Sequence, residues 1–371
     1  MDEVDDPNIK PFRVLSIDGG GMRGIYAATY LHSLSGGIRK RRQLNQELDI
    51  GKAFDLIVGT STGGILACAL ASGISMDLVV GMYRSRGRDV FSLPLPSSRM
   101  PWFLKECVAD HLRRPRALKA GNDALRAGLV EIFGKTTIKE VYQNRGIALA
   151  IPAIEMSSAR SWVFKTPHLE SSMGRDDDYR LVDVCLATSA APIYRSLAII
   201  ERPGQTSAKS TSCFADGGLW ANNPVLVGLI EALSMSGPEQ AIEIFSLGTC
   251  PKPGGCQVRP GSEHRGLVDW KFGAEAASLS ISAQEVAYDN MARLIADNLR
   301  KDCYTARLPQ RPVSQDLLSY LGMDDTREEA IEALVEQAHL DADEANVWCQ
   351  NDTSGRRFEA ALVCAVEECV A

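Results

Sequence analysis

The sequence predicts an α/β protein with a mostly parallel central sheet. Short apolar runs alternate with segments of helical periodicity along most of the 371 residues. Crossover connections between parallel strands place helices on both faces of the sheet. A hydrophobic content of 45% is ordinary for a folded globular chain. The runs expected to form strands are 13–18, 54–58, 148–154, 161–164, 213–215 and 242–247.

Helix signals fall between these runs. Asn223 is a good N-cap residue, and Pro224 suits the first turn of the apolar segment 225–233, which ends before Gly237 and Pro238. The other segments expected to be helical are 25–31, 64–70, about 269 to 299, and 326–335. The alternation of strands and helices therefore extends over nearly the whole chain.

Charge divides the chain unevenly. From Arg311 to the end there are 14 acidic and 4 basic residues, and the preceding stretch 308–312 contains two prolines. We predict a flexible acidic N-terminus at 1–11, a main domain at 12–310 and an acidic helical C-terminal subdomain at 311–371. Both a packing role and a regulatory role remain open for the last part.

Composition excludes several classes of protein. The net charge of −7 argues against a dedicated nucleic-acid binder, although the basic runs 39–42 and 113–116 could meet phosphates locally. The acidic start lacks the features of a signal peptide, and no apolar run approaches the roughly 18 residues of a membrane span, so we expect a cytoplasmic protein. The ten cysteines are scattered without metal-ligand spacing, which predicts reduced thiols and no metal site.

A serine lies in the sequence Gly59-Thr60-Ser61-Thr62-Gly63, between an apolar run and a helical segment. A strand, a sharp turn and a helix with serine at the apex form the context of the G-x-S-x-G nucleophile elbow. We therefore predict Ser61 as a nucleophile, with Gly59, Thr60, Thr62 and Gly63 forming the elbow. A purely structural turn is the alternative.

A glycine-rich loop follows the first expected strand. Its residues are Gly19, Gly20, Gly21, Met22, Arg23 and Gly24. Converging amides at a helix N-terminus favour an anion and could form an oxyanion hole for acyl transfer. The same letters satisfy the G-x-G-x-x-G fingerprint of dinucleotide-binding folds. The next strand runs into Ser61 without the acid that would bind a ribose, so we favour the oxyanion hole and keep a dinucleotide-binding oxidoreductase as the alternative.

A serine nucleophile needs a base within hydrogen-bond reach. Asp216 ends the apolar run 213–215 and precedes two glycines, and burial there would raise its pKa toward the working range of a base. An Asx-type turn is the structural alternative. Ser61, Asp216 and His264 also follow the chain order of an α/β-hydrolase triad, but His264 lies in a polar loop. His168 is similarly ambiguous.

Three segments together resemble the patatin-like phospholipase family in order and spacing: 18–24, 59–63 and 216–218. Supporting similarity is found at 186–192, 222–224 and 246–249, and the resemblance covers about residues 12 to 300. It implies a three-layer α/β/α fold and a Ser61-Asp216 dyad that needs neither histidine, metal nor cofactor. It also implies an oxyanion hole formed by Gly20, Gly21 and the neighbouring amides of 19–24, supported by Arg23. Gly218 departs from the alanine that the family often has.

The resemblance implies hydrolysis of fatty acyl esters of membrane phospholipids. Within the family, the stretch 164–168 and the extra C-terminal portion look like bacterial phospholipases switched on by cyclic nucleotides in anti-phage defence, the CBASS-type effectors. That similarity implies a cyclic di- or trinucleotide activator bound away from Ser61, and peripheral binding to the inner membrane when active. The stretches 91–96 and 100–104 could touch lipid, and a homo-oligomer is compatible with the sequence. An unregulated hydrolase of general lipid catabolism is the alternative.

Overall fold

The computed structural model describes residues 10–92, 103–204, 211–250 and 273–367 except 310 and 312, together with parts of 258–270. Its centre is an eight-stranded sheet in the order β5-β6-β3-β2-β1-β7-β8, with β4 pairing with β3 outside this path. Strands β3, β2, β1, β7 and β8 run parallel, and β4, β5 and β6 are antiparallel to their neighbours. The predicted α/β class with a mostly parallel sheet is confirmed.

All six predicted strands are present, and the structure adds β5 and β8. The strands are β1 Phe12–Ile17, β2 Leu56–Gly59, β3 Ala148–Glu155, β4 Arg160–Lys165, β5 Ala198–Glu201, β6 Thr211–Asp216, β7 Ile242–Leu247 and β8 Cys303–Leu308. No pattern in the sequence predicted β5 or β8. They lie at opposite edges of the sheet, and at least half of the residues of each are partly or fully exposed. Continuous apolar runs mark strands that are buried on both faces, so edge strands give a weaker signal.

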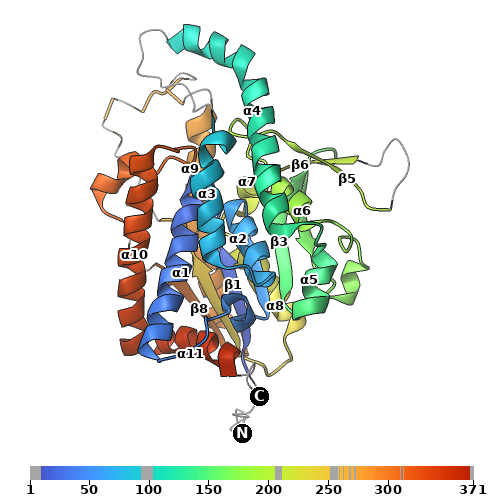
Figure 1. Cartoon of the computed structure of the whole chain (residues 1–371), viewed down its shortest axis with the longest axis vertical. Coiled ribbons are helices and arrows are strands. Elements are labelled where there is room, and N and C mark those ends of the chain that lie inside the picture. Colours follow the sequence, from blue (N-terminus) through green and yellow to red (C-terminus); the bar gives the residue numbers. More distant parts are fainter. Residues whose placement is uncertain are drawn as a thin grey trace.

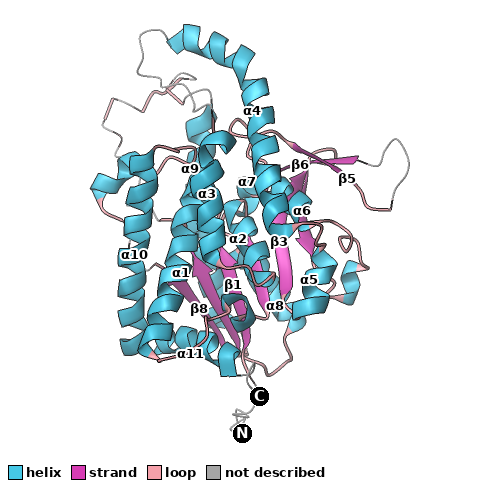
Figure 2. Ribbon diagram, viewed as in Figure 1, coloured by secondary structure: helices cyan, strands magenta, loops and turns pink. Residues whose placement is uncertain are grey.

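Alternating side chains of the central strands enter two separate cores. Val14 and Leu56 belong to the smaller cluster, which helix α8 (Val225–Met235) and helix α9 (Ala274–Asn298) cover. Leu15 and Ile57 belong to the larger cluster on the opposite face. Because successive residues of a strand point to opposite faces, one strand supplies both cores. The result is the three-layer arrangement visible in Figures 1 and 2.

Helices of the larger core come from both ends of the chain. They include α1 Gly24–Arg41, α2 Thr62–Ala71, α3 Met76–Val90, α4 Phe103–Phe133, α5 Ile138–Arg145, α6 Leu181–Thr188, α10 Glu328–Asn351 and α11 Thr353–Glu367. Figure 1 shows α10 beside α1, although the two helices are far apart in the sequence. Short elements complete the fold: α7 Gly218–Ala221, and 3₁₀ turns at Gly21–Arg23, Ile50–Ala53, Glu170–Ser172 and Gln315–Tyr320.

The C-terminal helices share the hydrophobic core of the main domain. Ile331 of α10 and Phe358 of α11 are fully or almost fully buried in the larger cluster. Glu359, only 2% exposed, pairs with Arg41 and Arg42 of the basic run that ends α1. These two arginines are therefore engaged within the protein. The division at residue 311 stays a prediction, and residues 1–9 of the predicted flexible N-terminus lie outside the described part.

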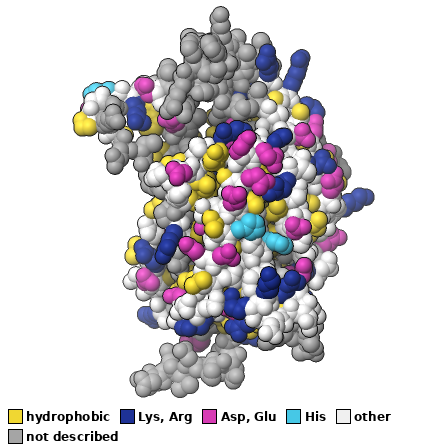
Figure 3. All heavy atoms as spheres, turned by 60° about the vertical axis from the view of Figure 1, so that its left-hand side comes forward, with side chains coloured by type: hydrophobic (Ala, Val, Ile, Leu, Met, Phe, Trp, Pro, Cys, Tyr) yellow, Lys and Arg dark blue, Asp and Glu magenta, His cyan; other side chains and the backbone are white. Residues whose placement is uncertain are grey.

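The surface over α1, α3 and α10 carries charges of both signs. Figure 3 shows basic and acidic side chains interspersed on the face toward α10. Ion pairs such as Arg84–Glu332 and Arg88–Glu328 join α3 to α10 there. Where the structure describes their side chains, the cysteines are free thiols. None of the described helices has the length and apolar character needed to cross a bilayer.

Candidate active site

Ser61 lies at a sharp turn between β2 and α2. Its backbone dihedrals are φ 55° and ψ −122°, a conformation that favours glycine and costs about 1–3 kcal/mol for other residues. The turn is tight because α2 begins against β1, where a Cβ on Gly63 would collide with the carbonyl oxygen of Ile17. The structure thus has the strand–turn–helix context expected from the sequence, with the serine at its apex.

Asp216, at the end of β6, is hydrogen-bonded to Ser61. The Ser61 hydroxyl donates to Asp216 Oδ2 at 2.7 Å, and the Gly218 amide donates to Asp216 Oδ1 at 2.6 Å. Burial raises the pKa of Asp216 to about 6, against the lowering effect of Ser61, Gly218 and the Arg195 cation. The carboxylate is therefore ionised at neutral pH, and its pKa is close to the range useful for a general base.

Neither His264 nor His168 lies with Ser61 and Asp216. The His264 side chain is 88% exposed and lies beside Glu263. His168 is buried elsewhere, where its ring nitrogens contact Thr166 and Glu231. No histidine is among the described residues that line the cavity around Ser61.

The amides of the glycine loop have different partners. The Gly19 amide donates to the Asn222 carbonyl at 2.9 Å, and the Gly20 amide donates to the Thr62 hydroxyl at 3.1 Å. The Met22 amide donates to the Met323 carbonyl at 2.8 Å. Gly21, in the left-handed region at φ 59°, has no acceptor for its amide among the described residues. The Gly21 amide is thus free to meet an oxyanion, whereas the Gly20 amide would first have to give up its bond to Thr62.

Arg23 and Gly24 hold the loop together. The Arg23 side chain is buried and its Nε donates to the Gly20 carbonyl at 3.3 Å, as does the Arg23 amide at 3.2 Å. The Gly24 amide turns back to the carbonyls of Gly21 and Met22. Arg23 thus holds the glycine loop through the Gly20 carbonyl, and its support of an oxyanion hole stays a prediction.

Several residues that position these groups have no role that the sequence predicted. Thr188, fully buried at the end of α6, accepts a hydrogen bond from the Ser61 amide at 2.9 Å. Thr249 and Asn222 both donate to the Gly19 carbonyl. All three lie in the stretches 186–192, 222–224 and 246–249, which resemble the family but carry no pattern that predicts a contact. The sequence alone could not reveal which groups they would contact.

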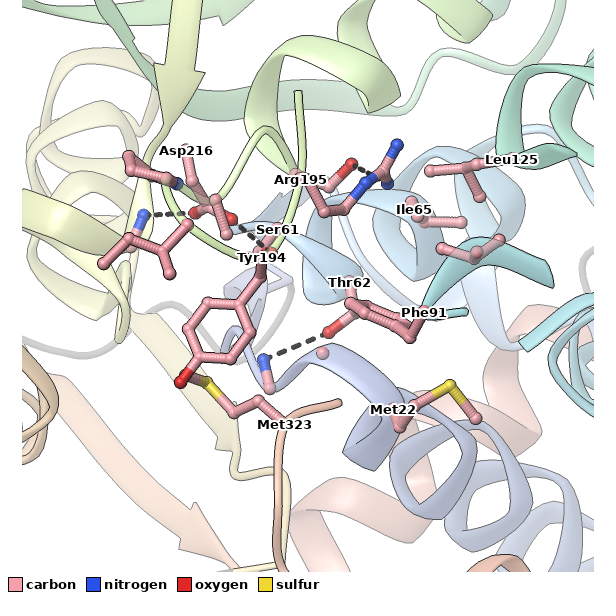
Figure 4. A pocket seen from close by; sticks show the side chains of 18 of the residues that line it. Met22, Ser61, Thr62, Ile65, Phe91, Leu125, Tyr194, Arg195, Asp216 and Met323 are labelled. Atoms are coloured by element: carbon pink, nitrogen blue, oxygen red, sulfur yellow. Dashed lines mark hydrogen bonds between the residues drawn. The ribbon is translucent and has the colours of Figure 1, made fainter. Parts of the chain in front are cut away.

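A cavity opens at Ser61 and Asp216. Figure 4 shows Tyr194 and Met323 on one side of Ser61, and Arg195, Ile65 and Leu125 on the other. Phe91 lines the cavity, whereas residues 93–96 and 100–102 of the stretches expected to touch lipid lie outside the described part. The wall is mainly apolar, with contributions from Met22, Ile65, Met82, Val90, Leu125 and Ile281. Such a cavity fits an acyl chain better than a polar metabolite.

The site combines a hydroxyl, a carboxylate and an amide loop beside an apolar cavity. This set is sufficient for acyl transfer through a serine ester. Among the described residues, no three His, Cys, Asp or Glu side chains gather in a way that could hold a metal ion.

Comparison with known proteins finds similarity to phospholipases. Residues 15–229 match the model of the family described as patatin-like phospholipase. A "cGAMP-activated phospholipase" of Pseudomonas aeruginosa is 34% identical over 78% of this chain and 77% of its own length. A protein of the same description from Escherichia coli is 35% identical over 62% of this chain and 57% of its own length.

Among solved structures, a human GIVD cytosolic phospholipase A2 covers 95% of this chain and 60% of its own, with 10% identity and a TM-score of 0.41. The family match spans more than half of the chain and includes the glycine loop, the serine turn and Asp216. It supports a phospholipase over the dinucleotide-binding oxidoreductase that the sequence left as an alternative. The chain belongs to the patatin-like phospholipase family.

Proposed function

We propose that the protein is a serine hydrolase that cleaves fatty acyl esters of membrane phospholipids through a Ser61-Asp216 dyad. The observation that carries the proposal is the 2.7 Å hydrogen bond from the Ser61 hydroxyl to the buried Asp216 carboxylate, at the mouth of an apolar cavity. A carboxylate in this position can accept the serine proton directly, so a histidine is unnecessary.

The first half-reaction forms an acyl-enzyme. Asp216 accepts the hydroxyl proton while Ser61 Oγ attacks the ester carbonyl carbon, and the amides of Gly20 and Gly21 donate to the developing oxyanion. The tetrahedral intermediate then collapses. The bond to the lysophospholipid oxygen breaks, and this leaving oxygen takes the proton from Asp216. The Gly20 amide must exchange its present acceptor, the Thr62 hydroxyl, for the oxyanion.

The second half-reaction releases the fatty acid. Asp216 accepts a proton from a water molecule, whose oxygen attacks the acyl carbonyl carbon. The bond to Ser61 Oγ breaks and the proton returns to the serine, which restores the resting enzyme. The use of one carboxylate as base and then as acid requires a pKa within reach of neutral pH, and the raised pKa of Asp216 supports this role.

We further propose activation by a cyclic nucleotide and a part in anti-phage defence. The descriptions of the relatives from Pseudomonas aeruginosa and Escherichia coli as cGAMP-activated phospholipases support this activation. The protein would then rest in the cytoplasm and act peripherally at the inner membrane once the nucleotide binds.

The decisive experiment measures fatty-acid release from vesicles of mixed bacterial phospholipids, with no nucleotide, with cGAMP and with other cyclic dinucleotides. We expect release that depends on Ser61 and rises with one of the nucleotides. Equal release with and without each nucleotide would support the hydrolase function but contradict activation by a cyclic nucleotide. No release from any vesicle, together with saturable binding of a nicotinamide dinucleotide, would instead support the oxidoreductase alternative.

A further inference from the structure

Arg195 is a buried cation in the wall of the cavity that contains Ser61. It follows α6 in the chain, and its residue surface is only 6% exposed. Nη1 donates to the Ser189 hydroxyl at 3.3 Å and Nη2 to the Asn122 side-chain oxygen at 3.2 Å. Both acceptors are neutral, and no carboxylate of the described residues lies within ion-pair distance. Arg86, which lines the same cavity, is by contrast paired with Glu131.

A buried guanidinium without a carboxylate partner is unfavourable because it loses its hydration without receiving a counter-charge. Burial lowers the pKa of Arg195 to about 10, so the group still carries its positive charge at neutral pH. Asp216 is the main charge that opposes this drop, but its oxygens are hydrogen-bonded to Ser61 and Gly218. The cation therefore has donors available for an anion that enters the cavity.

The chemistry of a guanidinium selects the anion. Its planar donors match the oxygens of a phosphodiester, and such charge-assisted hydrogen bonds are strong where water is excluded. In a glycerophospholipid, a glycerol unit joins the phosphodiester to the acyl esters. A molecule whose acyl chain occupies the apolar wall, with its ester carbonyl at Ser61, carries its phosphodiester into the same cavity.

We propose that Arg195 binds the phosphodiester of the phospholipid substrate and so selects glycerophospholipids over uncharged acyl esters. This inference rests on the proposed hydrolase function. It assigns to Arg195 a role in specificity, because the ester bond is broken by Ser61 and Asp216 whether or not a phosphate is present.

The test compares two substrates in the presence of cGAMP. One is phosphatidylglycerol in mixed micelles, and the other is diacylglycerol with the same acyl chains in the same micelles. Assays at about pH 8.5, well above the pKa of Asp216, keep the base ionised in every variant. We expect Arg195→Gln to lower kcat/KM for phosphatidylglycerol roughly 10- to 100-fold, the usual effect of losing a hydrogen bond to a charged group. The value for diacylglycerol should change by no more than about 3-fold.

Arg126→Gln is the matched control. Arg126 lies on α4, is partly exposed and pairs with Asp183, and it does not line the cavity. Its substitution should leave the ratio of the two kcat/KM values unchanged. If thermal unfolding shows that Arg195→Gln is not folded, Arg195→Lys is used in its place. This variant keeps the charge without the planar donors, so a partial loss of preference for phosphatidylglycerol is expected.

An equal fall for both substrates, or an unchanged ratio, would overturn the proposal. The phosphodiester of cGAMP is the other source of the same anion, and equilibrium dialysis distinguishes it. Loss of cGAMP binding in Arg195→Gln with an unchanged substrate ratio would assign the cation to the activator and overturn the substrate role. If the unsubstituted protein cleaves neither ester in a Ser61-dependent manner, the hydrolase function itself fails.

Discussion

The Thr188 hydroxyl accepts a hydrogen bond from the main-chain N–H of Ser61 and donates one to the carbonyl of Pro152, at 2.9 and 2.6 Å. One side chain of α6 thus joins the serine turn to β3, which pairs with β6 just where Asp216 lies. Because Thr188 is fully buried, no water can replace either bond. The serine and its carboxylate are therefore held in register by a residue whose side chain is hydrogen-bonded to neither reacting side chain.

Thr188→Val should lower both stability and turnover. Valine has a similar shape but leaves the Ser61 amide and the Pro152 carbonyl without partners, which costs about 1–3 kcal/mol for each buried group. Thr188→Ser keeps the hydroxyl and should retain most of the activity. Urea denaturation and fatty-acid release measure the two effects. Equal behaviour of the valine and serine variants would show that the hydroxyl has no part in positioning Ser61.

The strained backbone of Ser61 predicts a trade between stability and activity. Ser61→Gly and Ser61→Ala should both be inactive because both lack the nucleophile. Both also lose the bond to Asp216, so their difference isolates the backbone conformation at φ 55°. We expect the glycine variant to be more stable by about 1 kcal/mol in urea denaturation. A more stable alanine variant would contradict the assignment of strain.

The raised pKa of Asp216 predicts an acid limb in the pH profile of kcat/KM. The base acts in its ionised form and its pKa rises from 3.8 to about 6, so activity should be full above that pH and fall as the pH drops through it. The Arg195 cation lowers this pKa, so Arg195→Gln should move the limb to higher pH. A profile that stays flat down to pH 4 would exclude Asp216 as the base.

The dyad predicts that histidine is dispensable. Ser61→Ala and Asp216→Ala should each reduce fatty-acid release by at least about 10³-fold. His264→Ala should keep the activity, because its side chain is exposed and lies outside the cavity lining. Circular dichroism of each variant checks that the fold is intact. Loss of fatty-acid release in a folded His264→Ala protein would contradict the dyad and support a Ser61-Asp216-His264 triad.

The contact between Met323 and the glycine loop predicts a measurable link between the C-terminal segment and the site. The Met22 amide is protected by the Met323 carbonyl, and a Cβ on Gly21 would collide with the same carbonyl. If the activator opens the resting site by moving this segment, hydrogen exchange of peptide 19–24 should speed up when cGAMP is added. Unchanged exchange in a protein that cGAMP activates would place the control of activity elsewhere.

Local patterns were enough to predict the central elements. Apolar runs marked the six strands that were expected, and the string around Ser61 predicted a strand, turn and helix that the structure contains. These features depend on neighbouring residues and on burial of both faces of the sheet, so their signal is local. The edge strand β8 follows no such run, and the pairing of β7 with β8 comes from the whole sheet.

The sequence by itself determined the α/β class, the family and the pair of residues proposed for catalysis, because short motifs with fixed spacing carry that information. Only the tertiary structure decided which groups touch. It placed Thr188 beneath Ser61, Met323 against the glycine loop and Arg195 in the cavity wall without a carboxylate. These contacts join segments distant in the chain, and they depend on packing, burial and charge that no local pattern contains.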